Sequence, residues 1–300
     1  MTRLAEINGH IGSMSQLREI VGAMRSLAGM RVQESQRALP GIRRYAQSVA
    51  EAIGAALLLM PPSRSEAPPR GGRRAVILCA GEHGFVGAFN ERLLEAVATR
   101  LEPADLLFVI GSRGAALACE RGRTPAWTHA MASRVSGVPV VIDRLTTELY
   151  TRIVRGEIAR IEVTSSRYRQ GGAPTIENRL LLPLDTAALA LTQPRQPPLH
   201  NLDPARLLES LMAEYVFALL TEAVVESIGS ENAARFAAME AAHDNVEKKL
   251  GELHLAARRA RQGEITEELL DLIAGAEALS APSRHRSIPS HAPSGGRGST

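Results

Sequence analysis

The sequence has little cysteine and little lysine, and each shortage bears on which kinds of structural or binding site the chain can form. Cys79 and Cys119 are the only cysteines, so neither a disulfide framework nor a cysteine-rich zinc site is available. Both lie among small apolar residues, and we expect both to be buried in a protein of a reducing, cytoplasmic compartment. Lys248 and Lys249 are the only lysines. We assign this arginine bias to overall residue usage rather than to phosphate binding.

Strong net charge and long apolar runs are also missing. The formal net charge is only +3, which argues against a polyanion-binding surface. Trp127 is the only tryptophan, so aromatic stacking on nucleic acid is not expected. The longest apolar run, residues 52–60, is too short to span a bilayer. The polar N-terminus does not resemble a signal peptide. We expect a soluble protein, which could belong to a membrane complex.

The first block, residues 1–60, has the apolar spacing of a long amphipathic helix. Apolar residues recur at steps of three and four, interrupted by Arg18 and Arg25, which is typical of a coiled-coil seam; they are Leu4, Ile7, Ile11, Met14, Val21 and Ala28. Four glycines inside this stretch, Gly9, Gly12, Gly22 and Gly29, each cost about 1 kcal/mol relative to alanine. We therefore expect a broken helix or a closely packed second backbone, and a bend or break at Pro40-Gly41. Residues 61–72 are predicted to be a linker.

The second block, residues 73–195, alternates between strand and helix patterns. Short β-branched or apolar runs predict strands at 75–80, 106–110, 126–130, 158–164 and 176–183. Amphipathic stretches between them predict helices at 89–100, 113–121 and 138–155. This alternation is typical of a mostly parallel sheet covered on both faces.

The third block, residues 203–279, predicts a single long helix. Asp203 and Pro204 form a good helix start, and no proline interrupts residues 205–281. An unbroken helix of this length would span about 110 Å. Residues 281–300 lack apolar periodicity and are expected to be disordered. The predicted fold class is α/β, with a long antiparallel coiled coil of N- and C-terminal helices bracketing the sheet domain.

A glycine-rich turn follows the first predicted strand, in the sequence AVILCAGEHGFVGAFN at residues 75–90. Strand, glycine turn and helix can cradle phosphate, but this spacing fits neither the Rossmann fingerprint nor a P-loop. We favour the interpretation that the glycines permit a tight turn packed against a neighbour. Glu82 and His83 are expected to form a surface pair rather than a catalytic one. An α/β nucleotide-binding enzyme or sensor with coiled-coil arms and a stand-alone coiled-coil adaptor remain as alternatives.

The third block also contains a series of residue pairs in a recognisable order: Ser230-Glu231, Ala234-Arg235, Ala238-Met239, Arg261-Gln262, Ile265-Thr266, Glu268-Leu269 and Gly275-Ala276. This series resembles the C-terminal signature of the gamma subunit of F-type ATP synthases. The segment REIVGAMRSLAGMRVQESQ resembles the N-terminal helix of that family, with Ala23-Met24 in register, and PTIENRLLLPL at 174–184 matches one of its strands. In order along the chain, the resemblance covers about residues 2–279.

The resemblance implies a non-catalytic rotor subunit. Such a subunit couples ion flow through a membrane c-ring to ATP synthesis or hydrolysis by rotating inside a ring of alpha and beta subunits. The implied partners are alpha, beta, epsilon and the c-ring, without nucleic acid, direct small-molecule substrate, cofactor or metal. The implied location is the cytoplasmic side of the bacterial plasma membrane. The residues expected to contact partners are Met24, Arg25, Arg31, Arg261, Gln262, Thr266 and Glu268.

The sequence also departs from the family pattern in the glycine turn. Glu82-His83 stands where the family has Asp-Arg, Val86 where it has Cys, and Ala88 where it has Gly. These departures suggest a divergent copy, such as one from an accessory ATPase operon.

Overall fold

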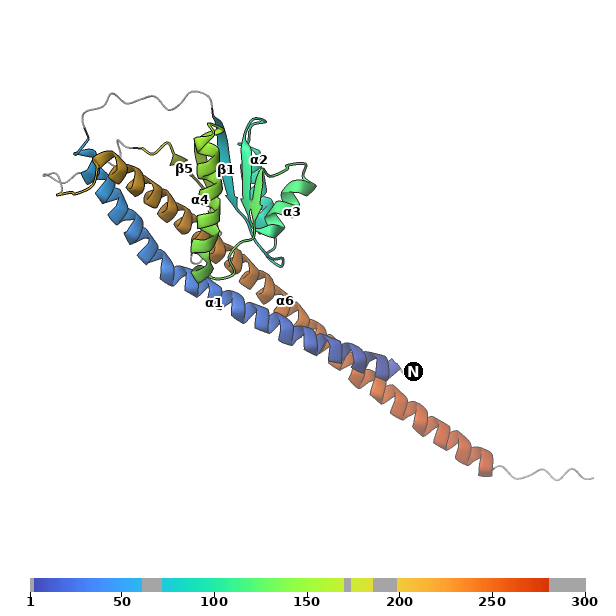
Figure 1. Ribbon diagram of the computed structural model, residues 1–300. Helices are drawn as coiled ribbons and strands as arrows, with labels where there is room; N and C mark the ends of the chain where they lie inside the picture. The colour runs from blue at the N-terminus through green and yellow to red at the C-terminus, as the bar shows by residue number, and fades with distance from the viewer. Residues whose placement is uncertain (1–2, 61–71, 170–173, 186–198, 281–300) are drawn as a thin grey trace, which may run out of the picture. The chain divides into compact units, whose positions relative to one another are not determined.

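Two long helices open and close the chain in the computed structural model, which describes residues 3–60, 72–169, 174–185 and 199–280 (Figure 1). In chain order the elements are α1 (Arg3–Leu57), β1 (Arg73–Cys79), α2 (Phe89–Ala98), β2 (Leu106–Ile110), α3 (Ser112–Glu120), β3 (Trp127–His129), the 3-10 turn η1 (Val135–Gly137), α4 (Val138–Val154), β4 (Ile158–Arg167), β5 (Thr175–Leu182) and α6 (Pro204–Ser280). The expected linker at 61–72 lies almost entirely outside the described residues, as does the C-terminal tail.

The strands form one mixed sheet in the order β3-β2-β1-β4-β5. Strand β1 pairs in parallel with β2 and β4, so Ile77 lies beside Phe108 on one side and Val163 on the other. Strand β3 continues the parallel arrangement, while β5 pairs with β4 in the antiparallel direction. Parallel neighbours need crossover connections, which α2, α3 and α4 supply. The predicted fold class is confirmed.

Helices cover both faces of this sheet (Figure 1). Because side chains alternate along a strand, Val76 and Leu78 pack with α2 on one face, together with Leu107, Val109 and the buried side of α3. Ile77 and Cys79 belong to the opposite face, which packs against α4 and α6. The α6 residues in that core are Ala218, Leu219, Leu220, Ala223, Val224, Val225 and Ile228. The middle of α6 is therefore part of the core of the sheet domain.

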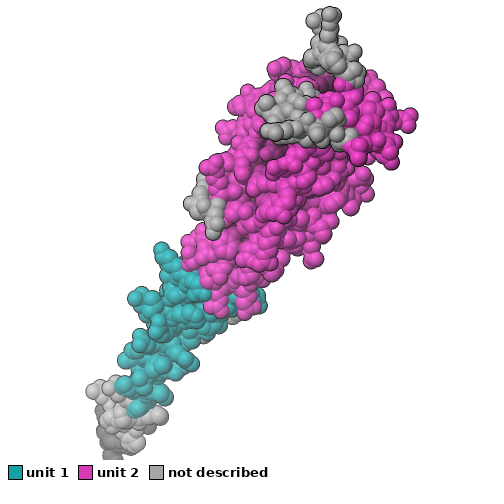
Figure 2. All heavy atoms as spheres, turned by 90° about the vertical axis from the view of Figure 1, so that its left-hand side faces the viewer, with its two compact units in different colours: residues 1–16, 247–300 teal, residues 17–246 magenta. Residues whose placement is uncertain are grey.

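The chain forms two compact units, residues 1–16 with 247–300 and residues 17–246 (Figure 2). In the larger unit α1 and α6 are antiparallel, because rising positions on α1 contact falling positions on α6: Arg25 with Glu240, Arg43 with Glu222 and Tyr45 with Glu214. The buried α1 residues of this unit follow the heptad positions of a coiled coil. They include Val21, Ala28, Ser35, Leu39, Ala46, Val49, Ile53 and Ala56. In the smaller unit Leu4, Ile7, Ile11 and Met14 are half-buried and continue the predicted seam.

The expectation about breaks in the first helix is wrong, because α1 continues unbroken through its glycines and through Pro40. A Cβ added at Gly9, Gly12 or Gly22 would meet nothing within 4 Å, so no neighbouring backbone requires glycine there. At Gly29 it would lie 3.5 Å from the ring of Phe236. Seam packing along the helix outweighs the cost of these residues, since tertiary contacts supply most helical stability.

The two cysteines differ in exposure. Cys79 is fully buried at the end of β1, and burial raises the pKa of its thiol to about 12. Cys119 is exposed, contrary to expectation. Helix α3 buries the face that carries Gly114 and Ala118. Cys119 follows Ala118, and successive residues of a helix point about 100° apart, so the Cys119 side chain points away from that face.

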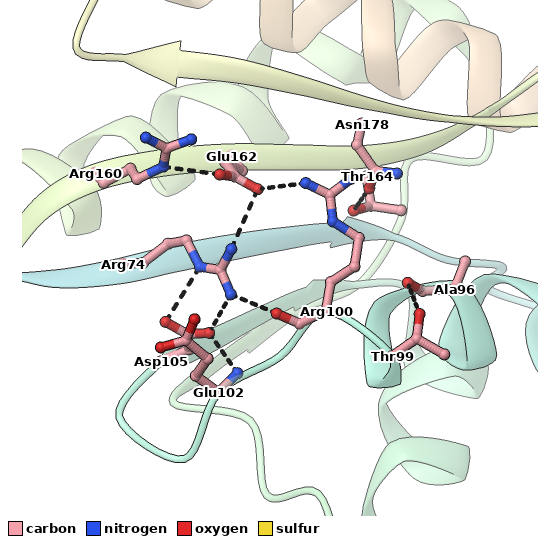
Figure 3. Close-up of polar contacts among 10 residues, drawn as sticks. All are labelled: Arg74, Ala96, Thr99, Arg100, Glu102, Asp105, Arg160, Glu162, Thr164 and Asn178. Atoms are coloured by element: carbon pink, nitrogen blue, oxygen red, sulfur yellow. Dashed lines mark hydrogen bonds and ion pairs between the residues drawn. The ribbon is translucent and has the colours of Figure 1, made fainter.

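An ion-pair network lies inside the sheet domain (Figure 3). Arg74 on β1 donates from Nη2 to Asp105 at 2.5 Å. Glu162 on β4 accepts from Arg160 at 2.8 Å and from Arg100 at 3.2 Å. The two carboxylate side chains are only 6% and 8% exposed. This network joins β1, β4, the end of α2 and the start of β2, without involving either long helix.

Candidate functional site

The turn after β1 is packed against the middle of α6. The N–H of Gly81 donates to Asn90 Oδ1 at 2.8 Å, which folds the turn back onto the start of α2. A Cβ at Gly81 would lie 3.1 Å from Asn90 Oδ1 and 3.2 Å from the carboxyl carbon of Glu231. Phe85 and Gly87 have φ of 60° and 54°. The prediction of a tight turn packed against a neighbour is confirmed at Gly81.

Glu82 fastens this turn to two neighbouring loops. Its carboxylate accepts from the N–H of Ser112 at 2.9 Å, the hydroxyl of Ser112 at 2.7 Å and the N–H of Met131 at 2.7 Å. Burial alone would raise the pKa of Glu82, but these three hydrogen bonds outweigh it and hold the pKa below its ordinary value. The charge of His83 also lowers the pKa of Glu82, while the hydrogen bonds of the carboxylate go to the start of α3 and the loop after β3. The expected surface pair of Glu82 with His83 stays a prediction.

Helix α6 supplies the groups that hold the other side of the turn. Glu231 Oε1 accepts from the N–H of His83 at 3.4 Å and from Arg235 Nη2 at 2.6 Å. Arg235 Nε donates to the carbonyl of Gly84 at 3.3 Å, and its Nη1 donates to Asn232 at 2.9 Å. A phosphate-binding turn keeps its N–H groups free for the anion. Here one N–H is bonded to a carboxylate, and the charges of Glu82 and Glu231 would repel phosphate.

A cleft of about 340 Å³ lies between this turn, α1 and α6. Its lining comes from Met24, Leu27, Ala28 and Arg31 of α1, from residues 82–85 and 132–133, and from Ile228, Glu231, Asn232 and Arg235 of α6. The side chain of Phe85 stands 69% exposed beside it, and Leu27 is 48% exposed. Two of the predicted contact residues, Met24 and Arg31, therefore share one apolar cleft.

A second set of polar contacts joins α6 to the sheet and to α1. Glu222 accepts from Arg43 Nε at 2.8 Å and from Arg179 Nη1 at 2.7 Å. One turn later, Glu226 accepts from Arg43 and lies 3.6 Å from Arg167 Nε. Both carboxylate side chains are nearly buried, at 9% and 3% exposed.

These two carboxyl groups respond differently to the same surroundings. Burial would raise the pKa of Glu222, but hydrogen bonds from Arg179 and Arg43 lower it overall. Burial also raises the pKa of Glu226, and the nearby charge of Glu222 adds to that rise, so the bond from Arg43 does not restore it. We take the arginine-paired Glu222 to be the better ionised of the two.

The predicted contact residues fall in both units. In the larger unit Arg25 pairs with Glu240 at 3.2 Å, and Arg31 pairs with Glu34 at 2.8 Å. In the smaller unit Arg261, Gln262, Thr266 and Glu268 are all exposed on α6. Thr266 donates its hydroxyl to the carbonyl of Gln262 at 2.8 Å. Arg261 also lines a groove with Leu4, Asn8, Ile11, Gly251, His254, Ala257 and Arg258.

Sequence reasoning missed Glu222 and Glu226. The available signal was their place in the stretch LLTEAVVESI, where two carboxylates four residues apart interrupt an apolar helix face. A buried charge of this kind requires a partner. The partners come from residues more than 40 positions away, so the sequence alone does not identify them.

Among the described residues, no cluster of three or more His, Cys, Asp or Glu side chains could hold a metal ion. Over the same parts of the chain, no helix is long and apolar enough to cross a bilayer.

Comparisons with known proteins agree with this architecture over nearly the whole chain. A family model described as ATP synthase matches residues 3–279. The ATP synthase gamma chain of Synechococcus elongatus is 28% identical, over 93% of this chain and 99% of that protein. The gamma chain of Prosthecochloris aestuarii is 26% identical with the same coverage.

Two solved structures share the fold. The rotor of the Euglena gracilis mitochondrial ATP synthase superposes with a TM-score of 0.58 at 12% identity, covering 87% of this chain and 98% of that one. A chain of the central stalk and c-ring structure of the Tetrahymena thermophila mitochondrial ATP synthase gives 0.54 at 16% identity, covering 74% and 99%. At these identities the likeness concerns the fold alone.

Proposed function

The chain belongs to the ATP synthase gamma-chain family, and on this premise we propose that it is the rotating central shaft of an F-type ATP synthase. In this role the chain couples ion flow through a membrane c-ring to ATP synthesis or hydrolysis in a head of alpha and beta subunits. The epsilon subunit and the c-ring bind the α/β domain. The chain works as a peripheral subunit on the cytoplasmic face of the bacterial plasma membrane.

The observation that carries this proposal is the exposed end of α6. Five large aliphatic side chains between residues 261 and 276 are 50% to 71% exposed: Ile265, Leu269, Leu270, Leu272 and Ile273. A run of this kind is unfavourable in water and marks a surface that a partner covers. The surrounding head of the complex would supply that cover.

The same end of the helix presents different chemistry on different sides. Positions spaced by three and four residues share a face. Ile265, Leu269 and Leu272 therefore form an apolar face, while Glu264, Glu267 and Asp271 form an acidic one on the opposite side. A ring of three beta subunits around this helix would meet a different surface at each position.

This asymmetry supplies a physical route from rotation to nucleotide chemistry. Each beta subunit favours the conformation whose contacts with the facing side of the shaft are strongest. Turning the shaft exchanges these favoured conformations among the subunits. Because coupling between sites is reciprocal, ATP hydrolysis in the head turns the shaft, and a turning shaft drives ATP release.

In this proposal the chain itself performs no catalysis. The turn at residues 81–88 is the part of the fold that most resembles a nucleotide site. Its contacts with Glu82 and Glu231 support a structural role there instead.

Seven residues are proposed to contact the head: Met24, Arg25, Arg31, Arg261, Gln262, Thr266 and Glu268. For Arg261 and Gln262 we expect the double variant R261A/Q262A to reduce the ATPase activity of the purified complex about tenfold, as loss of one interface hot spot would. Glu252→Ala, an exposed change on the same helix, is the control and should leave the activity unchanged.

The function itself is tested by purifying a tagged chain from its own host and assaying what accompanies it. We expect alpha and beta subunits in excess over the chain, with ATPase activity that disappears when residues 261–300 are removed. Removal of residues 281–300 alone is the matched control, since it leaves the described part of α6 intact. A lone monomer or homodimer that binds nucleotide by itself would overturn the proposal in favour of an enzyme or sensor.

A further inference from the structure

We propose that six charged side chains between α6, α1 and the sheet form the anchor through which torque passes between the sheet domain and the helix pair. This anchor network consists of Arg43 of α1, Arg167 of β4, Glu177 and Arg179 of β5, and Glu222 and Glu226 of α6. The inference rests on the proposed function, because only a rotating shaft needs to pass torque between these parts.

The geometry makes α6 the centre of the network. Glu222 binds Arg43 at 2.8 Å and Arg179 at 2.7 Å, so this one carboxylate joins α1 to β5. Glu226, one turn further on, binds Arg43 and approaches Arg167 at 3.6 Å, so it joins α1 to β4. Every contact of Glu222 or Glu226 with an arginine of the anchor network therefore crosses between two elements.

Two serines on the same stretch of α6 add hydrogen bonds to the sheet. Ser227 donates to the carbonyl of Cys79 at 2.6 Å, and Ser230 donates to the carbonyl of Ser166 at 2.7 Å. Residues 222–230 of α6 are thus bonded to β1, β4 and β5. Helix α4 packs on the same face of the sheet as α6. The described contacts include no comparable set of bonds between these two helices.

Directional bonds resist sliding in a way that apolar packing does not. The hydrophobic effect is non-directional, so helix ridges can move one step over a sheet and recover much of their contact. A helix that slips by one turn moves by about 5.4 Å. Because Glu222 and Glu226 are one turn apart, that movement would bring one of them to the other's position and carry the other away from its arginines. A buried charge would then be left unpaired, which is strongly unfavourable.

The charge balance of the network fits a mechanical role better than a binding one. Arg43, Arg167 and Arg179 match Glu177, Glu222 and Glu226 in number. Arg167 also pairs with Glu177 at 3.0 Å within the sheet. The network therefore leaves no surplus charge to attract an ion or an anionic ligand.

The test uses membrane vesicles that hold the assembled complex with R167M/R179M in this chain. Methionine keeps much of the apolar stem of arginine, and both arginine side chains are about 40% exposed, at 41% and 38%. ATP hydrolysis is measured together with the membrane potential that ATP generates, read with an oxonol dye that responds to proton or sodium transport. The ratio of the two is recorded against an increasing opposing potential.

We expect the ratio of ion transport to hydrolysis to fall at least about twofold in R167M/R179M, because Glu222 and Glu226 then keep only Arg43 of α1 and no longer bind the arginines of the sheet. The loss should grow as the opposing potential rises, since slippage depends on load. A merely structural defect would instead lower hydrolysis and transport by the same factor at every load. Arg179→Lys, which keeps the charge, should recover part of the ratio.

The matched control is Arg74→Met, which breaks the equally buried network inside the sheet (Figure 3). It should leave the ratio at the wild-type value even if it lowers stability. If R167M/R179M does not assemble, the same ratio is measured in the single variant Arg179→Met, in which Glu222 keeps its bond to Arg43. A wild-type ratio at all loads would overturn the anchor only, whereas wild-type vesicles without ATP-driven potential would count against the proposed function.

Discussion

The hydroxyl of Ser227 donates a hydrogen bond across 2.6 Å to the main-chain carbonyl of Cys79, the last residue of the central strand. Both residues are at most 1% exposed. The bond satisfies a carbonyl at the end of β1, where the strand leaves the sheet and the glycine turn begins. It therefore fixes the longest helix of the chain to the middle of the sheet at a position that water does not reach.

We expect Ser227→Ala to lower the free energy of unfolding of the isolated chain by about 1–2 kcal/mol, because it removes the donor of a buried hydrogen bond. The measurement is a guanidinium chloride titration. Ser210→Ala is the control, since that hydroxyl is exposed and bonds only to the carbonyl of Arg206 in its own helix. The control should be close to neutral. Equal effects of the two changes would contradict the role given to Ser227.

The hydrogen bonds of Glu82 predict a pH-dependent contribution to stability. A carboxyl whose pKa is lowered by folding stabilises the folded state above its unfolded pKa, which is about 4.3 for glutamate. That contribution is lost as the pH falls through the lower, folded-state pKa. The charge is partly exposed, so solvent screening reduces its size.

We expect Glu82→Gln to lower the free energy of unfolding by about 1–2 kcal/mol at pH 7, since an amide cannot accept all three bonds. The difference from wild type should shrink as the pH falls below about 4, where the wild-type carboxylate gains a proton. Denaturant titrations at several pH values measure it. Glu95→Gln, an exposed change on α2, is the control. A difference that grows towards low pH would contradict the assignment.

Much of the fold could be predicted from periodicity, because it depends on local patterns. Periodicity predicted the alternation of strands and helices between residues 73 and 182, and it predicted the uninterrupted helix of the third block. The breaks expected in α1 were wrong, since local propensities are weak and a continuous buried seam outweighs them. Exposure of Cys119 was also missed, because composition does not show which face of α3 meets the sheet.

The site was less predictable than the fold. The matching signature pairs identified the family, and the glycine turn was correctly interpreted as tight packing at Gly81. The contacts of Glu222 with Arg43 and Arg179 join residues far apart in sequence, so no local pattern contains them. The contacts proposed for Arg261 and Gln262 depend on partner subunits and stay predictions.

The glycine turn offers a test of backbone strain within a few residues. Gly87 has φ of +54°, a region that side chains with a Cβ rarely adopt, whereas Gly84 does not have a positive φ. An added Cβ would meet nothing within 4 Å at either position. We therefore expect Gly87→Ala to lower the free energy of unfolding by about 1 kcal/mol through strain alone, and Gly84→Ala to be neutral. Denaturant titration of the two variants should separate them, and equal stabilities would contradict the strain at Gly87.

A close approach of the two long helices within residues 17–246 gives the last prediction. A Cβ at Gly229 of α6 would lie 3.2 Å from the Cβ of Ser35 on α1, whereas one at Gly22 of α1 would meet nothing within 4 Å. Both glycines are inside helices, so alanine at either position gains about 1 kcal/mol of helix propensity. At Gly229 that gain is opposed by the separation that the helices would need.

We therefore expect Gly22→Ala to raise the free energy of unfolding by about 1 kcal/mol, and Gly229→Ala to give no gain or a loss. Thermal unfolding of the isolated chain, followed by circular dichroism, measures both variants. The double variant S35G/G229A, compared with Ser35→Gly alone, separates the two terms, because removing the Ser35 side chain relieves the contact and the comparison leaves only helix propensity at residue 229. If Gly229→Ala alone stabilised the chain as much as Gly22→Ala, the helices would not be closely packed at Ser35.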